Sequence, residues 1–331
     1  MSAAVALAHP NIALSKYWGK REGAGNFPAV PSLSVTLADM STRTRVSFDE
    51  ALARDRLVLD GTDTEGEPLS RVRALLDRVR AASDETRFAE VRSRNDFPTA
   101  SGLASSASGF AALALAATRA AGLDWDAARV SDLARRSSAS AARSLFGGYV
   151  ELDAGPVAPR ESDILSARAL APVDHLDLTV LVCITTEAAK LVGSTSGMIH
   201  TASHGPYHAA WLGEAPRLHA ELRSAVLARD FAKVGELSEA SALAMHASAI
   251  AAGVVYWNAA TLALLASVRG LRARGVAAYA TVDAGPHVKV LVRRQDVSAA
   301  ESELSAVPGV LRVLRALPGG AARLADESEA P

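Results

Sequence analysis

The stretch from residue 97 to residue 109 constrains what this chain can fold into more than any other. Pro98 opens it, small residues fill it, and an Ala/Leu-rich run at residues 110–121 follows directly. Small side chains let a backbone approach an anion closely, and the unpaired N–H groups of a helix N-terminus favour negative charge. The stretch therefore predicts a phosphate-binding loop, although the same pattern also occurs where a loop merely packs against a helix. It does not fit the lysine-containing P-loop, because no lysine follows Gly102 or Gly109.

Composition indicates a globular protein that is large enough for two domains. The chain has 331 residues, of which 49% are apolar and 21% are charged. With 35 basic and 36 acidic residues the formal net charge is −1, so bulk charge gives no reason to expect a nucleic-acid partner. The one cysteine, Cys183, excludes an intrachain disulfide and lies in an apolar run that predicts a buried strand.

Neither a signal peptide nor a membrane span is expected. Residues 1–9 lack the basic segment that begins a signal peptide. The most apolar run, residues 110–117, is far shorter than the roughly 20 residues that cross a bilayer. The sequence therefore predicts a soluble, cytoplasmic protein with no membrane partner.

The order of the expected elements indicates an α+β fold. Strands are expected at residues 3–14, 32–37, 42–48, 56–59, 90–94, 149–152, 178–185, 277–282 and 288–292. Helices are expected at residues 69–82, 110–121, 126–136, 207–227, 231–250 and 257–274, and a loop at residues 156–172. The elements do not alternate as βαβ units, which favours α+β. We expect an N-terminal domain at residues 1–175, a C-terminal domain at residues 176–317 and a disordered tail at residues 318–331.

Two short polar segments carry side chains that suit an anionic ligand. Lys16 and Lys20 flank two aromatic residues and could bind a phosphorylated substrate, although a solvated lysine pair beside a packed tryptophan is the commoner arrangement. Ser138, Ser140 and Arg143 suit a carboxylate or a phosphate, whereas an arginine at such a place can also cap a helix C-terminus.

Asp283 and three evenly spaced histidines need more than their positions to indicate chemistry. Asp283 stands between a strand and an Ala-Gly-Pro turn, where an aspartate usually bonds its own backbone. His200, His204 and His208 lie four residues apart, as on the metal-binding face of a helix. Pro206 interrupts any continuous helix through them, so we do not expect a metal site there.

Taken together, these stretches resemble one enzyme family. Residues 98–107 match the second signature of the GHMP kinase superfamily, Pro-x-x-x-Gly-Leu-x-Ser-Ser-Ala. From about residue 8 to residue 292 the chain resembles the mevalonate diphosphate decarboxylases. This resemblance rests on residues 11–21, 32–37, 95–100, 102–108, 144–148 and 283–286. The Lys-Tyr-Trp-Gly-Lys stretch at residues 16–20 is far more specific than the superfamily loop.

The resemblance implies a fold and a reaction. The fold is the two-domain GHMP kinase-like fold, with a ribosomal protein S5 domain 2-like N-terminal domain that binds ATP and substrate and a ferredoxin-like C-terminal domain. The reaction is the ATP-dependent decarboxylation of (R)-mevalonate 5-diphosphate to isopentenyl diphosphate, CO2, ADP and phosphate, through phosphorylation of the tertiary 3-hydroxyl. ATP as co-substrate, Mg²⁺ and a homodimer are implied as well, since Mg²⁺ neutralises charge that develops in phosphoryl transfer.

The resemblance also implies a role for each matching residue. Asp283 would be the base for the 3-hydroxyl, Arg143 would face the substrate carboxylate and phosphates, and Lys16 would face the reacting phosphoryl group. The implied substrate-binding residues are Tyr17, Trp18, Gly19, Lys20, Arg71, Ser138, Ser140, Arg143, Ser194 and Thr195. The implied ATP-binding residues are Asn11, Ser93, Asn95, Ser101, Gly102, Leu103, Ala104, Ser105, Ser106, Ala107 and Ser108. No motif assigns the ligands of Mg²⁺.

A few residues depart from the family pattern. Ser137 and Ala139 stand where the family usually has glycines, which restricts the backbone beside the two substrate-binding serines. Pro31 and His287 stand where the family more often has a small polar residue and an asparagine. None of these changes removes a catalytic group.

Two other functions stay open at the level of sequence. One is a sister enzyme of the same fold, a phosphomevalonate decarboxylase or a mevalonate 3-kinase, which acts on a less phosphorylated mevalonate. Asp283 and Arg143 together argue against a kinase that stops at the phosphate ester, but they do not separate a monophosphate from a diphosphate. The other is a superfamily member that only binds nucleotide, and the intact Lys16, Arg143 and Asp283 argue against it.

Overall fold

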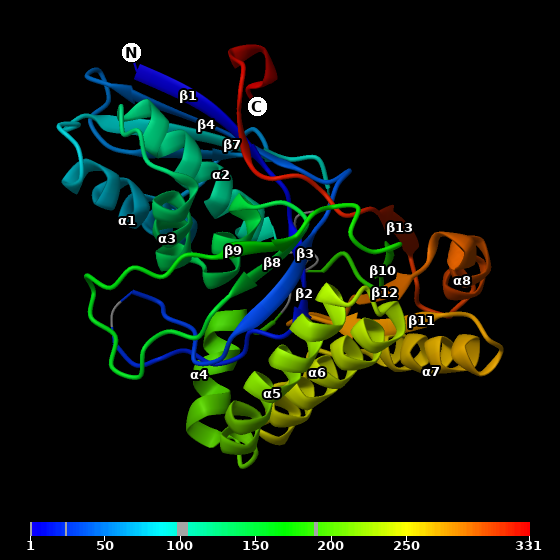
Figure 1. The fold of residues 1–331 in the computed structure, drawn as a ribbon. Helices are drawn as coiled ribbons and strands as arrows, with labels where there is room; N and C mark the ends of the chain where they lie inside the picture. The colour runs from blue at the N-terminus through cyan, green and yellow to red at the C-terminus, as the bar shows by residue number, and fades with distance from the viewer. Residues whose placement is uncertain (1, 24, 98–104, 189–190) are drawn as a thin grey trace.

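Three β-sheets and the helices that pack on them form the described structure (Figure 1). The computed structural model describes residues 2–23, 25–97, 105–188 and 191–331. The strands are β1 (Ser2–Ala8), β2 (Asn11–Ser15), β3 (Ser32–Thr36), β4 (Thr42–Asp49), β5 (Arg56–Leu59), β6 (Thr62–Asp63), β7 (Phe88–Asn95), β8 (Tyr149–Leu152), β9 (Arg168–Ala171), β10 (Thr179–Ile184), β11 (Ala278–Val282), β12 (Val288–Val292), β13 (Arg312–Ala316) and β14 (Arg323–Ala325). The helices are α1 (Glu67–Ala81), α2 (Ser105–Ala120), α3 (Ala127–Ser137), α4 (Ser194–His204), α5 (His208–Leu227), α6 (Phe231–Ala251), α7 (Ala259–Ala273) and α8 (Val297–Ser305), with the 3-10 segments η1 (Ala139–Leu145), η2 (Arg294–Asp296) and η3 (Glu327–Glu329).

The first sheet carries the helices α1, α2 and α3 on one side of the molecule (Figure 1). Its strand order is β14-β1-β4-β7-β5-β6, and only the pair of β5 and β7 is parallel. Along β4, buried Val46 and Phe48 alternate with half-buried Arg43 and Arg45, so one face of the strand lies on the core. The buried face of α2 is rich in alanine, which lets the helix contact β1 and β4 closely.

The other two sheets share a hydrophobic core across the middle of the chain. In the sheet β2-β3-β8-β9, Leu14 and Leu33 belong to the same buried cluster as Val180 of β10 and Leu222 of α5. The sheet β11-β12-β10-β13 is covered on both faces, since Val180 faces this cluster while Leu181 faces α7 and α8. Strands that are buried on both faces appear in the sequence as continuous apolar runs. These contacts connect the N-terminal and C-terminal parts of the chain through packed side chains.

Most expected elements are confirmed, and the differences have local causes. The single strand that we expected at residues 3–14 is two strands, β1 and β2, which lie in different sheets on either side of Pro10, a residue without a backbone N–H. The loop that we expected at residues 156–172 was wrong in part, because it contains β9, an edge strand that pairs with β8. The sequence analysis also missed α4, α8 and β13. Cys183 is buried in β10, as expected.

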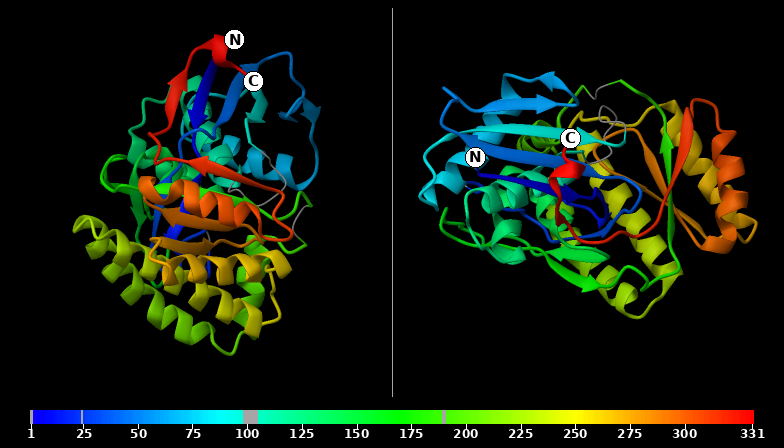
Figure 2. Two further views of the ribbon diagram at one scale, coloured as in Figure 1. Left: turned by 90° about the vertical axis from the view of Figure 1, so that its right-hand side faces the viewer. Right: turned by 90° about the horizontal axis from the view of Figure 1, so that it is seen from above.

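The expectation of a disordered tail at residues 318–331 was wrong. β14 pairs antiparallel with β1 in the register Val5 to Ala325, and the two strands lie side by side in Figure 2. Upstream of β14 the chain crosses so close to Gly147 that a Cβ there would lie 2.6 Å from the carbonyl carbon of Gly320. A short strand with few apolar residues gives little signal in the sequence, and the partner strand that orders it lies at the other end of the chain. The division at residues 175 and 176 remains a prediction.

Two further expectations concern helices. Within the described residues, none of the helices has both the length and the apolar character to cross a membrane. The histidine series is split as Pro206 predicted, because α4 ends at His204 and α5 begins at His208. The rings of His200 and His204 stack with their centroids 4.3 Å apart, and the described residues contain no group of three metal-ligating side chains.

We predict that deletion of residues 320–331 destabilises the protein. The deletion removes β14 from the edge of β1 and exposes the apolar surface that Leu324 covers. Net backbone hydrogen bonds contribute about 0.5–1.5 kcal/mol each, so the free energy of unfolding should fall by about 1–3 kcal/mol in urea denaturation. The control is Glu327→Gln, which breaks only the partly exposed ion pair with Arg45 and should cost about 1 kcal/mol or less. Equal stability of the truncated and complete chains would contradict the prediction.

Candidate active site

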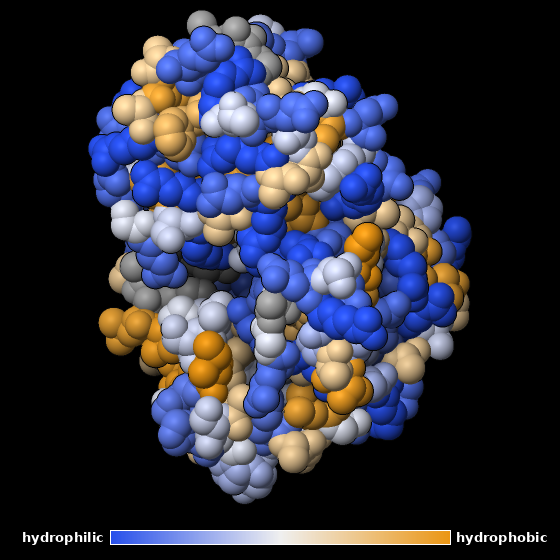
Figure 3. Space-filling model, turned by 90° about the vertical axis from the view of Figure 1, so that its left-hand side faces the viewer, coloured by the Kyte–Doolittle hydropathy of each residue, from blue (hydrophilic) through white to orange (hydrophobic). Residues whose placement is uncertain are grey.

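Two adjoining cavities contain most of the described residues that the sequence analysis singled out. The first has a volume of about 500 Å³ and is lined by the segment after β2, by η1, by the start of α4 and by the turn after β11. The second has a volume of about 350 Å³ and is lined by β4, β5, β7, α1 and α2. Glu67, Arg71 and Ser106 line both cavities and therefore mark where they meet. The face of the molecule that carries α1, α3 and α4 is hollowed between its upper and lower parts, and hydrophilic residues surround the hollow (Figure 3).

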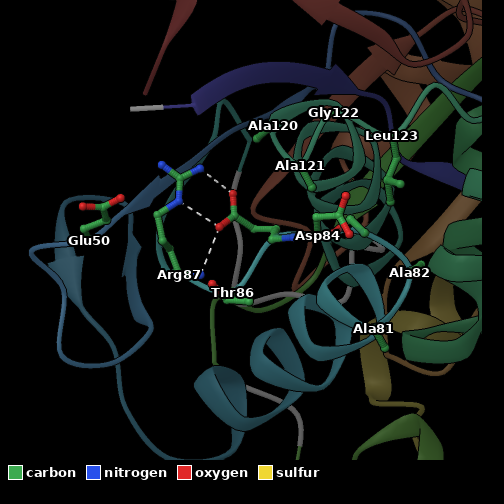
Figure 4. A pocket seen from close by; sticks show the side chains of 12 residues that line it. Glu50, Ala81, Ala82, Asp84, Thr86, Arg87, Ala120, Ala121, Gly122 and Leu123 are labelled. Carbon is green, nitrogen blue, oxygen red and sulfur yellow. Dashed lines mark hydrogen bonds and ion pairs between the residues drawn. The ribbon is translucent and has the colours of Figure 1, made fainter.

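A third and larger cavity lies elsewhere and contains none of the predicted residues. It has a volume of about 850 Å³ and is formed by residues 81–87, residues 120–123 and Glu50, at the C-terminal ends of α1 and α2 (Figure 4). Its arginine, Arg87, forms an ion pair with Glu85 at 2.6 Å. Carboxylates and helix C-termini gather there, which is unfavourable for a phosphorylated ligand. We assign the chemistry to the two smaller cavities.

In the first cavity, Asp283 is held between two lysines. The Lys16 Nζ lies 2.6 Å from Oδ1 of Asp283, and the Lys289 Nζ lies 3.0 Å from Oδ2. The Lys16 ammonium also donates to the carbonyl oxygen of Ala13 at 2.8 Å. These groups meet because Lys16 follows β2, Asp283 follows β11 and Lys289 lies in β12. An ion pair, rather than a bond to its own backbone, therefore defines the setting of the aspartate side chain.

Burial and charge act in opposite directions on the pKa values of this cluster. Burial raises the pKa of Asp283, but the two ammonium groups outweigh it and hold that pKa well below the usual range of a carboxyl. For Lys16, burial outweighs the attraction of Asp283 and lowers the pKa to about 8. Asp283 is therefore ionised throughout the physiological range, whereas Lys16 loses its proton at mildly alkaline pH.

Arg143 is buried at the back of the same cavity. Its Nε donates to the hydroxyl of Ser34 at 3.0 Å, and its two terminal nitrogens donate to the hydroxyl of Ser32 at 2.6 Å and to Oδ1 of Asn11 at 3.3 Å. Burial lowers the pKa of the guanidinium to about 10. The amide of Asn11 in turn donates to the hydroxyl of Ser144 at 2.8 Å. Arg143 is thus oriented by side chains of β2 and β3 and does not act as a simple helix cap.

The segment after β2 packs against the C-terminal part of the chain and also lines the cavity. Trp18 is buried against Tyr256 of the C-terminal part. The indole N–H of Trp211 donates to the carbonyl oxygen of Trp18 at 2.6 Å. Gly19 has a φ of +121°, a conformation that side chains rarely adopt. The turn places Lys20 at the rim of the cavity, where its Nζ donates to the hydroxyl of Thr195 at 3.2 Å.

The remaining predicted substrate-binding residues also lie at this cavity. The hydroxyl groups of Ser138 and Ser140 are 3.0 Å apart, and Arg71 donates to the carbonyl oxygen of Ser137 at 3.0 Å. Tyr17 lines the cavity with a buried hydroxyl that has no hydrogen-bond partner among the described residues. Burial raises the pKa of that hydroxyl, so it stays protonated. Ser194 lines the cavity from the first turn of α4.

Some of the predicted ATP-binding residues line a cavity, and others do not. Ser93 and Asn95 line the second cavity from β7. Ser106 lies where both cavities meet, whereas Ala107 and Ser108 are buried within α2 and line neither cavity. Residues 101–104 of the loop lie outside the described residues, and α2 begins at Ser105.

Sequence reasoning missed three residues of this site. Lys289 interrupts an otherwise aliphatic strand, residues 288–292, and a charge in a continuous apolar run was the signal that could have identified it. Ser32 and Ser34 alternate with leucine and valine in β3 and are fully buried, yet nothing in the sequence reveals that their hydroxyl groups accept from Arg143.

Comparison with known proteins supports the resemblance seen in the sequence. Residues 8–163 match the family model of the diphosphomevalonate decarboxylase-like N-terminal domain, and residues 180–311 match that of the mevalonate 5-diphosphate decarboxylase C-terminal domain. The diphosphomevalonate decarboxylase of Candida albicans is 33% identical over 88% of this chain and 84% of its own length. A phosphomevalonate decarboxylase of Haloferax volcanii is 34% identical over 99% of each chain.

Solved structures agree with these relatives. The mevalonate diphosphate decarboxylase from Enterococcus faecalis has a TM-score of 0.89 and 36% identity, and the match covers 98% of this chain and 99% of that chain. A structure in complex with MVAPP, AMPPCP and magnesium has a TM-score of 0.90, 36% identity and the same coverage. Family models match both parts of the chain, and its fold is the two-domain α+β fold of the GHMP kinase type. Relatives more than 30% identical match most of its length. The chain therefore belongs to the diphosphomevalonate decarboxylase family.

Proposed function

We propose that this protein catalyses the ATP-dependent decarboxylation of mevalonate 5-diphosphate to isopentenyl diphosphate, with release of CO2, ADP and phosphate. The observation that carries the proposal is the ionised Asp283 between Lys16 and Lys289, at a cavity whose back wall holds Arg143. Relatives with this activity in their names and a structure that holds MVAPP with AMPPCP support it.

The reaction requires the groups that line this cavity. A tertiary hydroxyl is a poor leaving group, and its phosphorylation by ATP turns it into a good one. Loss of that phosphate leaves a tertiary cation, and the neighbouring carboxylate then departs as CO2. Asp283 can accept the hydroxyl proton, although its lowered pKa makes it a weak base. We infer that the proton is transferred late, when bonding to the phosphoryl group has already acidified the hydroxyl.

The charges of the first cavity suit a substrate that is anionic at both ends. Lys16 and Arg143 lie at the end that holds Asp283, and Lys20 and Arg71 lie toward its rim with Thr195. Burial lowers the pKa of Lys20 and of Arg71, because it destabilises the charged form of each side chain. An anion bound beside them stabilises these charged forms again. We assign the carboxylate end of the substrate to Arg143 and its phosphate end to Lys20 and Arg71.

We assign ATP to the second cavity. Its lining is largely apolar, with Leu57 and Val91 from the sheet and Phe110 from α2, which suits a planar base. The Arg71 guanidinium lies over the Phe110 ring at 4.6 Å from its centroid, so one residue borders both ligands. The phosphates would then extend toward Ser106, where the two cavities meet.

The residues at this junction fit Mg²⁺. The cation prefers a few carboxylate or hydroxyl oxygens together with substrate phosphates and water, and Glu67 and Ser106 supply such oxygens. When bound with ATP, Mg²⁺ neutralises charge on the transferred phosphoryl group. The similar structure that holds magnesium with MVAPP and AMPPCP supports Mg²⁺ as the cation used with ATP.

A phosphomevalonate decarboxylase is the second candidate, because the Haloferax volcanii relative matches this chain over 99% of both lengths. Asp283 and Arg143 would serve either substrate, so the choice depends on the rim of the first cavity. Three further expectations, a homodimer, the absence of nucleic-acid and membrane partners, and a cytoplasmic location, stay predictions.

We predict that Asp283→Asn lowers kcat by about 10²–10⁴-fold, because the variant keeps the shape of the side chain but cannot accept the proton. Release of labelled CO2 from mevalonate 5-diphosphate measures kcat. Asp153→Asn is the matched control, since Asp153 is an exposed carboxylate that pairs with Arg168 outside both cavities. A variant at position 283 with more than a tenth of the wild-type kcat would refute the role of Asp283.

We predict that kcat/KM decreases as the pH rises through about 8. This ratio reports the free enzyme, in which the pKa of Lys16 is about 8, and a neutral amine no longer stabilises the phosphoryl group. A pH–rate profile from pH 6 to 10 measures the decrease. Lys16→Arg should retain part of the activity and lose this basic limb, because an arginine stays charged. An unchanged basic limb in Lys16→Arg would assign the titration to another group.

We predict that the diphosphate is preferred over the monophosphate by about ten- to a hundredfold in kcat/KM. One additional charge-assisted hydrogen bond to the distal phosphate in the transition state would give a preference of this size. Parallel assays of ATP-dependent CO2 release from mevalonate, its 5-phosphate and its 5-diphosphate measure the preference. Lys20→Met should reduce it, and Lys233→Met, which changes an exposed lysine paired with Glu236, should not. Equal efficiency of wild-type enzyme on both phosphates would favour the second candidate.

A further inference from the structure

Lys289 is a buried charge that neither cavity explains. It is 1% exposed, is the second residue of β12, and lines neither the first nor the second cavity. The residues on either side of it, Val288 and Val290, belong to the hydrophobic core between β10, α7 and α8. Its ammonium forms an ion pair with Oδ2 of Asp283 at 3.0 Å.

Fold stability does not account for a lysine at this place. Removing an ammonium from water costs free energy, and replacement of buried ionic groups by apolar ones of similar size is often neutral or stabilising. Asp283 already has a closer partner in Lys16, at 2.6 Å. An aliphatic residue at position 289 would simply extend the apolar run of the strand. The lysine therefore needs another explanation.

The geometry points to control of the Asp283 carboxylate. Lys16 binds one of its oxygens and Lys289 binds the other, so the carboxylate plane cannot rotate without breaking an ion pair. Each carboxylate oxygen can accept two hydrogen bonds, which leaves acceptor sites for a substrate hydroxyl. The two ammonium groups come from different parts of the fold, Lys16 from the segment after β2 and Lys289 from β12, so each restrains the side chain from its own direction.

We propose that Lys289 is a positioning residue, which orients Asp283 toward the substrate hydroxyl and keeps it ionised. The inference rests on the proposed decarboxylation. Lys289 lines neither of the two ligand cavities, and its ion pair among the described residues is with Asp283. Its contribution should therefore appear in the chemical step and in the titration of Asp283, while the binding of either substrate is nearly unaffected.

Other charged and titratable groups surround this pair, and one of them, Lys16, has a pKa that the Lys289 ammonium also lowers. Lys16, which follows β2, and Arg143 of η1 are the other cations beside Asp283 in the part of the chain that the structure describes. His246 of α6 donates to the carbonyl oxygen of Val282 at 3.2 Å, and burial lowers its pKa to about 3. Burial lowers the pKa of His287 to about 4 and raises that of Cys183 in β10 to about 12. Both histidines are thus neutral and the thiol protonated at neutral pH, so removal of Lys289 changes the field at Asp283 by one charge.

The test compares Lys289→Met with wild type in ATP-dependent CO2 release, followed across pH. Methionine keeps the apolar stem and deletes the charge. We expect kcat to fall about tenfold, because the loss of orientation of the Asp283 carboxylate outweighs its gain in basicity. Both KM values should stay within about threefold of wild type. The pKa of Asp283, followed by NMR of its labelled carboxylate, should rise by about 1–3 units, because loss of a nearby cation raises the pKa of a carboxylate.

Val290→Ala is the matched control, since it disturbs the packing of the same strand without touching the ion pair. It should lower stability in urea and leave the pKa of Asp283 in place. Lys289→Met with a wild-type kcat, or with an unchanged pKa of Asp283, would overturn the inference. If wild-type protein releases no CO2 from any mevalonate derivative, the proposed function fails first. A double-mutant cycle of Asp283→Asn and Lys289→Met in urea then decides whether the two charges are coupled in the fold.

Discussion

The contact on which the rest of the site depends is the ion pair between Lys16 and Asp283. It joins the end of β2, in the N-terminal part of the chain, to the turn after β11, in the C-terminal part. A buried charge is stable only when it is paired, so each partner requires the other to be placed to within an ångström. The nearby residues supply further charges, Arg143 from η1 and Lys289 from β12. The cluster keeps an excess of positive charge at one end of a cavity that we assign to an anionic substrate.

Apolar packing makes this precision possible. Leu14 of β2 packs in the same cluster as Val180 of β10 and Leu222 of α5, so the strand that ends just before Lys16 is anchored to the C-terminal part. Trp18, two residues after Lys16, is buried against Tyr256 on the far side. The backbone on both sides of the lysine is thereby fixed, which limits the motion of its ammonium. Rigid support of this kind is what a preorganised electrostatic site requires.

The sequence predicted the site better where several residues share one short motif than where single residues meet in space. The segment from Lys16 to Lys20 and the turn at Asp283 were both identified, and the structure brings their side chains to one cavity. Lys289 was missed, although it interrupts an apolar strand, because a lone lysine has no motif. β14 was missed for a related reason, since its order comes from pairing with β1 more than 300 residues earlier in the chain.

By itself, the sequence determined the α+β class, most helices and strands, and the short segments that carry the chemistry, because hydrophobic periodicity and small-residue motifs are local properties. Only the tertiary structure decided which charges share a partner and what they do to one another. The lowered pKa of Asp283 and the value of about 8 for Lys16 arise from burial and from contacts between distant strands. Such contacts leave no local trace, because the strands that supply them are brought together by the hydrophobic core.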